Sequence, residues 1–159
     1  MVTHDPEEAM SICDKVAVMN EGKIHQIDTP INLINNPKTI FVSSFILGNN
    51  ILNLTKNGNS YMSCLGELNS SGLLNNKNIK SISISPKFIS IERSKSGNAI
   101  VLSKEFLGEF LIYKVSINEN ILRVRTNINN LLNNGDKCSL SINKNSYYFL
   151  YPGAQKIYI

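Results

Sequence analysis

The feature that most constrains this chain is a change in hydrophobic periodicity near Gly48. Before that residue, signals for short helices alternate with the pattern of a β-hairpin. From Ile51 onward, apolar residues recur with a period of two, which is typical of β-strands with one buried face. The sequence therefore predicts a small α/β segment over residues 1–48 and a mainly β domain over residues 49–159.

The α/β segment contains three helix signals and one hairpin signal. A cap residue followed by proline opens residues 5–13 and again residues 29–37, and this pair favours a helix start. Two strand-like runs in residues 16–28 flank Gly22, which tolerates the positive φ of a tight turn. Apolar residues spaced for one face of a helix occupy residues 41–46. The expected order is helix, hairpin, helix, helix.

The second part reads as short strands separated by polar, asparagine-rich turns. Pro86 interrupts one run, and Gly108 lies in the middle of another, where it predicts a bulge or a bend. Five to seven strands in about 110 residues, bent by internal glycine, favour a small barrel of the OB type. The runs are residues 51–65, 81–91, 99–117, 121–126, 135–142 and 147–151.

Composition excludes several classes of protein. With 42% hydrophobic and 18% charged residues, the 159-residue chain can bury a core and is not a disordered tail. No run approaches the ~18 apolar residues of a membrane-spanning helix, and the acidic start lacks a signal peptide's apolar region. Three scattered cysteines are typical of a reduced cytosolic protein. The net charge of +4 is compatible with a nucleic-acid or membrane-surface partner but does not require one.

A long ordered set of matches in the first 48 residues resembles the end of the ATP-binding subunit of ABC-type importers. Two positions depart from the family pattern, since Asp28 replaces a glycine and Leu47 is inserted before Gly48. The matching residues are Thr3-His4-Asp5, Glu8-Ala9, Asp14-Lys15, Met19, Gly22, Ile24, Gln26, Thr29-Pro30, Pro37, Phe41-Val42 and Phe45-Ile46.

Residues 49–159 resemble the accessory domain that follows in importers for ferric iron, polyamines and maltose, the transport-associated OB (TOBE) domain. Pro86 matches the family's Arg-Pro-Glu strand end, whereas Ser85 and Lys87 replace the arginine and the glutamate. The resemblance implies a regulatory and dimerisation module that forms a homodimer. It also implies a cytoplasmic location at the inner face of the membrane, through permease subunits, and a small regulatory ligand on the TOBE domain.

The same resemblance identifies His4 as the switch histidine, which in the family contacts the γ-phosphate and attacking water of ATP. ATP and Mg²⁺ are therefore expected in a full-length parent. This chain contains no Gly-x-x-x-x-Gly-Lys-Ser/Thr phosphate loop, and the family's signature motif and acidic strand end are also missing. We therefore interpret the chain as a C-terminal fragment that is not an enzyme by itself and holds no cofactor or metal.

Other residues leave alternatives open. Glu7 and Glu8 could be catalytic carboxylates, but at a helix N-terminus they are expected to interact favourably with the helix dipole. Asp5 belongs to the family motif and is also expected to cap the helix. His25 has no potential ligand partner at metal-binding spacing, so a solvated or packed side chain is expected. The runner-up function is a stand-alone OB module for small oxyanions or single-stranded nucleic acid. It would use a basic row of Lys114, Arg123 and Arg125 and stacking on Tyr147, Tyr148, Phe149 and Tyr151, although the small net charge does not favour nucleic acid.

Overall fold

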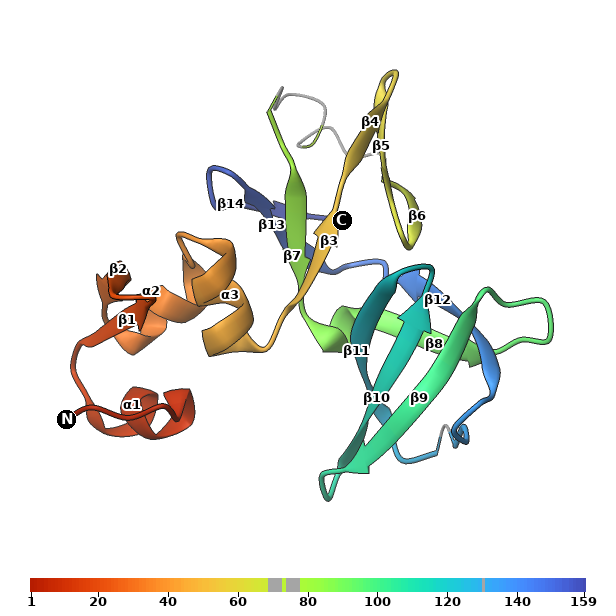
Figure 1. Ribbon diagram of the computed structural model, residues 1–159, viewed down its shortest axis with the longest axis horizontal. Coiled ribbons are helices and arrows are strands. Elements are labelled where there is room, and N and C mark those ends of the chain that lie inside the picture. Colours follow the sequence, from red (N-terminus) through yellow and green to blue (C-terminus); the bar gives the residue numbers. More distant parts are fainter. Residues whose placement is uncertain (69–72, 74–77, 130) are drawn as a thin grey trace.

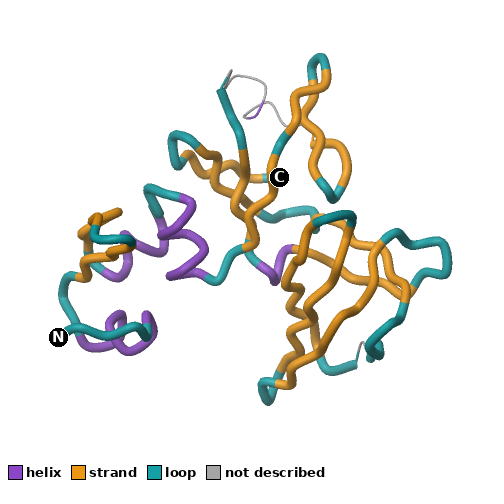
Figure 2. Tube along the Cα trace, viewed as in Figure 1, coloured by secondary structure: helices purple, strands orange, loops and turns teal. Residues whose placement is uncertain are grey.

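The computed structural model describes residues 1–68, 73, 78–129 and 131–159. In Figure 1 the first 48 residues form a group of short elements at one end, and strands fill the rest of the molecule. Figure 2 shows the same division by secondary structure, with the helices gathered toward the N-terminus. The predicted mainly β fold with a small α/β N-terminal segment is confirmed at this level.

The N-terminal elements follow the predicted order. Each helix begins after a side chain that caps it, namely Asp5, Thr29 and Thr39, and the third helix ends at Gly48 in the left-handed conformation with φ of 60°. The hairpin turns through Gly22 with φ of 73°. The elements are α1 (Pro6–Ile12), β1 (Val16–Asn20), β2 (Lys23–Asp28), α2 (Pro30–Asn35) and α3 (Ile40–Leu47).

These elements share a small apolar core of their own. Val18 of the hairpin, Leu33 of α2 and Val42 of α3 are buried against one another. Met10, Val16, Phe41 and Ile46 pack around them and remain partly exposed. The main core lies in the β region and is larger, with Ile82, Ile84, Val115 and Tyr148 among its members.

The β region contains twelve strands among the described residues, more than the five to seven predicted. They form three antiparallel sheets of four, five and three strands, ordered β14-β13-β7-β3, β11-β10-β9-β12-β8 and β4-β5-β6. Their bounds are β3 (Asn50–Asn53), β4 (Thr55–Asn57), β5 (Ser60–Ser63), β6 (Gly66–Leu68), β7 (Ser81–Ile84), β8 (Ile89–Arg93), β9 (Ala99–Phe106), β10 (Phe110–Ile117), β11 (Asn120–Asn127), β12 (Lys137–Ile142), β13 (Tyr147–Tyr151) and β14 (Gln155–Tyr158).

The predicted single barrel is not observed as a closed structure. The two edges of the five-stranded sheet, β8 and β11, approach each other, but no strand pairing joins them among the described residues. One reason for the division into sheets is Pro86, which cannot donate a backbone hydrogen bond and opens a 3₁₀ turn, Pro86–Phe88, directly after β7. The chain therefore leaves the four-stranded sheet there and enters the five-stranded sheet as β8.

At Gly108 the sequence predicted a bulge or a bend, and the structure has the bend. Gly108, with φ of 74°, lies in the turn that joins β9 to β10. The bulge lies instead within β9 at Leu102, because Lys114 pairs with Ser103 and Val115 pairs with Val101, which leaves Leu102 without a partner in the register.

The four-stranded sheet is covered on both faces. Ile82 and Ile84 of β7 belong to the main core, whereas Ser81 and Ser83 alternate with them and face the N-terminal elements. Ser83 contacts Ser43 of α3 through their hydroxyl oxygens at 2.5 Å. The serine row is therefore buried as deeply as the isoleucine row, and α3 is fastened to the sheet.

Asn50 joins the two larger sheets. Its side-chain amide donates to the carbonyl of Arg123 at 2.7 Å, and its side-chain oxygen accepts from the Arg123 N–H at 2.7 Å. The side chain thus pairs with the edge strand β11 as a neighbouring backbone would. This contact is one link that sets how the four-stranded sheet lies against β11.

Candidate functional site: the His4 loop and the apolar face beside it

The loop that carries His4 is held by hydrogen bonds on both sides of it. The Asp5 carboxylate accepts from the N–H groups of Glu7 at 2.9 Å and Glu8 at 3.4 Å, and the Asp5 N–H donates to the Thr3 hydroxyl at 3.1 Å. Asp5 is thus the predicted helix cap, and the two glutamates occupy the first turn of α1. His4 itself is exposed.

The hairpin that follows α1 in the chain has an apolar outer face. Val18 pairs with Gln26 on the buried face, while Ala17 pairs with Ile27 and Met19 with Ile24 on the opposite face. The exposed fractions of Met19, Ile24 and Ile27 are 57%, 56% and 55%. A two-stranded hairpin is marginally stable in water and is normally covered by further structure. The register therefore marks this face as a packing surface.

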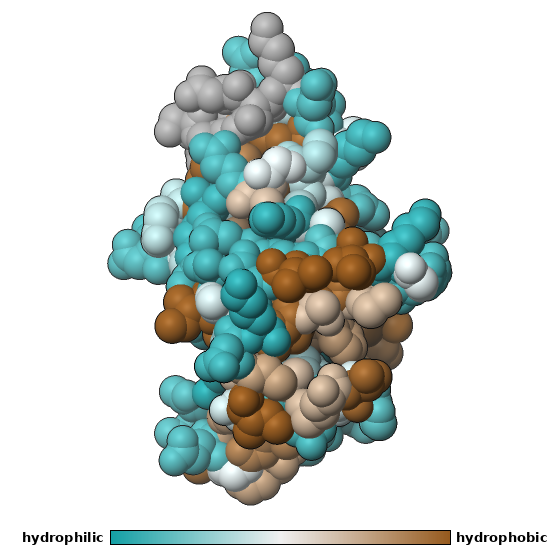
Figure 3. All heavy atoms as spheres, turned by 90° about the vertical axis from the view of Figure 1, so that its left-hand side faces the viewer, coloured by the Kyte–Doolittle hydropathy of each residue, from teal (hydrophilic) through white to brown (hydrophobic). Residues whose placement is uncertain are grey.

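Exposed apolar side chains are also frequent elsewhere in the first 48 residues. Of the twenty large hydrophobic side chains exposed in the described residues, ten lie within the first 48, which are less than a third of the chain. Figure 3, with this end of the molecule toward the viewer, shows brown apolar residues in several places on the face. The ten are Met1, Val2, Ile12, Met19, Ile24, Ile27, Ile31, Ile34, Ile40 and Phe45.

Within the described residues, no three His, Cys, Asp or Glu side chains gather as metal ligands would. The three cysteines are free, and burial raises the pKa of the Cys64 and Cys138 thiols, which disfavours the reactive thiolate. None of the described helices is long and apolar enough to cross a membrane.

The structure brings together the three basic residues of the alternative site for oxyanions or nucleic acid. Lys114 lies directly opposite Arg123 on the neighbouring strand, and Arg125 follows on the same face of β11. All three are exposed. The Arg125 guanidinium lies 3.6 Å from the centre of the Phe110 ring, a cation–π contact.

The aromatic half of the runner-up site is divided between different environments. Tyr148, Phe149 and Tyr151 are only 1%, 1% and 3% exposed, so a nucleic-acid base cannot stack on them. Tyr148 belongs to the main core, and the Tyr151 hydroxyl donates to the carbonyl of Pro37 at 2.6 Å. Tyr147 packs edge-on to Phe88 and Phe149. These aromatic residues therefore serve packing.

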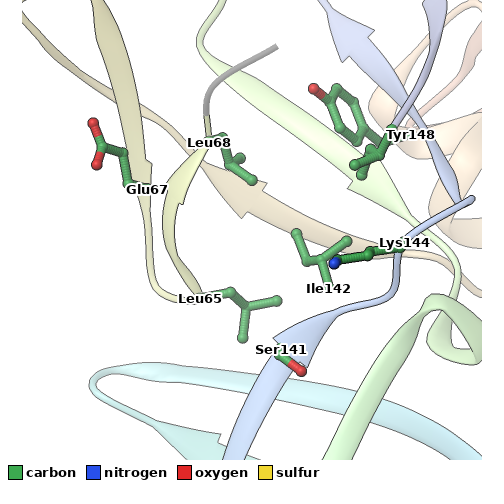
Figure 4. Close-up of a pocket in the computed structure, with 8 residues that line it drawn as sticks. Leu65, Glu67, Leu68, Ser141, Ile142, Lys144 and Tyr148 are labelled. Atoms are coloured by element: carbon green, nitrogen blue, oxygen red, sulfur yellow. The ribbon is translucent and has the colours of Figure 1, made fainter.

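A cavity of about 240 Å³ lies between β6 and the end of β12. Figure 4 shows Leu65, Leu68, Ile142 and Tyr148 around it, and Lys144 also lines it. The volume is below the usual range for small-molecule sites, roughly 300–1,000 Å³. We therefore do not place the main site here.

The comparisons with known proteins point to one class of protein, the import ATP-binding proteins. Over 61 residues the chain is 56% identical to the spermidine/putrescine import ATP-binding protein PotA of Bacillus thuringiensis (strain Al Hakam), and equally to that of Bacillus anthracis. That match covers 38% of this chain and 18% of each relative. Part of this chain is related to import ATP-binding proteins. The PotA protein of Desulfitobacterium hafniense (strain Y51) is 59% identical over 51 residues, which are 32% of this chain and 15% of that protein.

The matches cover only a small part of each relative. The matched part spans less than a fifth of the length of these curated relatives. No family model matches the chain. The similarity supports a relation to the C-terminal region of an ABC importer's ATP-binding subunit, in agreement with the resemblance found from the motifs.

The sequence did not reveal the structural role of two residues that organise the molecule. Asn50 was one of many asparagines, and nothing local distinguishes it from the others. His25 is the extra residue of a bulge in the hairpin, because Val18 pairs with Gln26 and Met19 pairs with Ile24. Its Nδ1 lies 3.2 Å from the Thr39 hydroxyl. The bulge was not visible in the residue pattern, which reads equally well as a regular hairpin.

Proposed function

We propose that this chain is the C-terminal part of the ATP-binding subunit of an ABC importer of the polyamine class. In the full-length parent, ATP hydrolysis would drive transport of the solute across the membrane. The relatives are spermidine/putrescine import proteins, which supports the class of solute, and the motif from Thr3 to Gly48 supports the type of subunit.

The observation that carries the proposal is the apolar outer face of the hairpin, in the same N-terminal segment as the exposed His4 loop. Burial of apolar surface stabilises by roughly 25 cal/mol per Å², so such a face favours a covering partner. In the proposal, the rest of the ATPase domain of the parent covers it. His4 would then lie at the nucleotide, donating to the γ-phosphate of ATP that is bound with Mg²⁺.

The β region has an accessory role in this proposal. Residues 49–159 would form a TOBE domain of OB-like type, following the ATPase remnant of residues 1–48. The domain would support a homodimer and take a small regulatory ligand. The parent would sit at the cytoplasmic face of the membrane through its permease subunits.

The test uses the full-length parent with His4 replaced by alanine. Removing a contact made only in the transition state is expected to lower ATP turnover by roughly 10²–10³-fold, by analogy with loss of one oxyanion-hole donor. ATP affinity is expected to change by less than about tenfold, because ground-state binding is spread over the phosphate loop and Mg²⁺. Turnover and nucleotide affinity are measured on the same preparation.

The matched control is Lys95→Ala, an exposed side chain in the turn between β8 and β9. It is expected to leave both quantities unchanged. A turnover of the His4→Ala protein within threefold of the unmutated parent would show that His4 is not the switch residue. A loss of ATP affinity as large as the loss of turnover would contradict a transition-state role.

A further inference from the structure

A second, larger groove lies between the N-terminal elements and the four-stranded sheet. Its volume is about 480 Å³, within the usual range for small-molecule sites. One wall is the start of α3 with Thr39 and Phe41, and the other is the end of β13 with Tyr151 and Pro152. The groove therefore joins two parts of the chain that are more than 100 residues apart.

His25 is directed into this region by the bulge of the hairpin. The ring lies 4.9 Å from the Phe41 ring, centre to centre, in addition to the Thr39 contact. Thr39 is also the cap of α3, since its hydroxyl accepts from the N–H of Val42 at 3.2 Å. The first N–H groups of a helix have no partner within the helix, and they favour negative charge nearby.

The groove contains a buried hydroxyl that is not satisfied. Ser81 is 2% exposed, and its Oγ has no hydrogen-bond partner among the described residues. Its cross-strand neighbour Tyr151 cannot supply one with its hydroxyl proton, which is donated to Pro37. An unpaired buried hydroxyl is unfavourable, on the order of 1–3 kcal/mol. A bound group that accepts a hydrogen bond would remove this cost.

The charge of the groove is positive. Lys38 and Lys80 are exposed and line it, and no aspartate or glutamate is among the described residues that do so. Asp28 offsets part of the charge of Lys38: hydrogen bonds from Asn32 and from the Thr29 N–H are the main causes that lower the pKa of that carboxyl, and the positive charge of Lys38 adds to them. Lys80 is therefore the stronger candidate for contact with an anion.

We propose that this groove binds a small organic anion with a planar apolar body, such as an aromatic or heterocyclic carboxylate or phosphate. The two lysines and the Ser81 hydroxyl would hold the anionic group. Phe41 and Pro152, which are not buried, would contact the apolar body. A polyamine does not fit, because its ammonium groups would be repelled by the lysines.

This proposal is independent of the nucleotide chemistry proposed for the parent. The ligand contacts both the N-terminal elements and the sheet, so it would stabilise their association. Since it would bind the folded chain and not the unfolded one, it would also raise the melting temperature.

The test is calorimetric titration of the whole chain with four probes. Phenyl phosphate and indole-3-acetate carry the two possible anionic groups on a planar ring, inorganic phosphate lacks the ring, and spermidine carries the opposite charge. We expect saturable binding of at least one ring-bearing anion with a dissociation constant below about 1 mM, roughly −4 kcal/mol. Inorganic phosphate should bind at least tenfold more weakly, and spermidine should not compete.

Three variants distinguish the groove from other surfaces. Lys80→Gln and Ser81→Ala are each expected to weaken binding at least fivefold, whereas Lys95→Gln, which removes a lysine elsewhere on the surface, should leave it within twofold. Without ligand, Ser81→Ala should melt at the same temperature as the unmutated chain or higher, because it removes an unpaired hydroxyl. That result separates loss of contact from loss of folding.

The outcomes are decisive in each case. Absence of binding by both ring-bearing anions overturns the proposal, and so does equal affinity for inorganic phosphate or full binding by the Lys80→Gln protein. A lower melting temperature of ligand-free Ser81→Ala would contradict the unpaired hydroxyl. The His4 experiment is unaffected by any of these results.

Discussion

Replacing Tyr151 with phenylalanine tests how the N-terminal elements are held to the sheet. The Tyr151 hydroxyl donates to the Pro37 carbonyl at 2.6 Å, across 114 residues of sequence. Both residues are buried. Phenylalanine keeps the ring and leaves no cavity, but the carbonyl loses its partner. We expect the free energy of unfolding to fall by about 1–3 kcal/mol at neutral pH, the cost of an unpaired buried acceptor.

The same hydroxyl gives the effect a pH dependence. Burial raises the pKa of Tyr151 from 10.0 to about 12, and a hydrogen bond with Ser43 acts in the opposite direction. Below pH 10 the tyrosine is protonated in both the folded and the unfolded chain, so its contribution is complete. Between pH 10 and 12 the unfolded chain loses the proton first, so stability falls as the pH rises.

A gap of two pKa units corresponds to about 2.7 kcal/mol at most. We reduce this to about 1–2 kcal/mol, because the neighbouring groove admits solvent and weakens the effect. The stability difference between the unmutated chain and Tyr151→Phe should therefore shrink by that amount from pH 8 to pH 12. Titration of the other tyrosines and the lysines occurs in both proteins and cancels in the difference.

The assay is urea denaturation followed by circular dichroism at pH 8, 10 and 11.5. Tyr158→Phe is the matched control, because it removes a hydroxyl from a side chain that is 72% exposed. It is expected to change stability by less than about 0.5 kcal/mol. The reasoning is refuted if Tyr151→Phe is no less stable than this control, or if its stability difference stays constant across the pH range.

Two further substitutions test the β region by thermal unfolding. Asn50→Ala leaves the backbone N–H and carbonyl of Arg123 without their partner, so the free energy of unfolding should fall by about 2–4 kcal/mol. A fall of less than about 0.5 kcal/mol would show that this contact does not join the sheets. Gly97→Ala would place a Cβ 2.1 Å from the Cys138 carbonyl oxygen, so the backbone must move at a cost of about 1–3 kcal/mol. The neighbouring Ser96→Ala is the control for Gly97, and equal stability of the two variants would contradict the close approach.

The sequence by itself determined the local elements of the N-terminal segment. Asp5 with Pro6 and Thr29 with Pro30 start helices, and Gly48 ends one, because each signal acts on backbone groups within a few residues of itself. The change to period two likewise predicted a mainly β second part. The role of His4 stays a prediction from resemblance, and the structure adds that the residue lies in an exposed loop held by hydrogen bonds.

Only the tertiary structure decided how these elements are combined. The strand pattern could not distinguish one closed barrel from three sheets, because a period of two specifies which side chains share a face and not which strands pair. The row of Ser81 and Ser83 has the pattern of a solvated face, yet α3 buries it. The groove with His25, Lys80 and Ser81 arises from the same packing. Contacts such as Asn50 with Arg123, 73 residues apart, depend on where the whole chain folds back, and local sequence carries no signal for that.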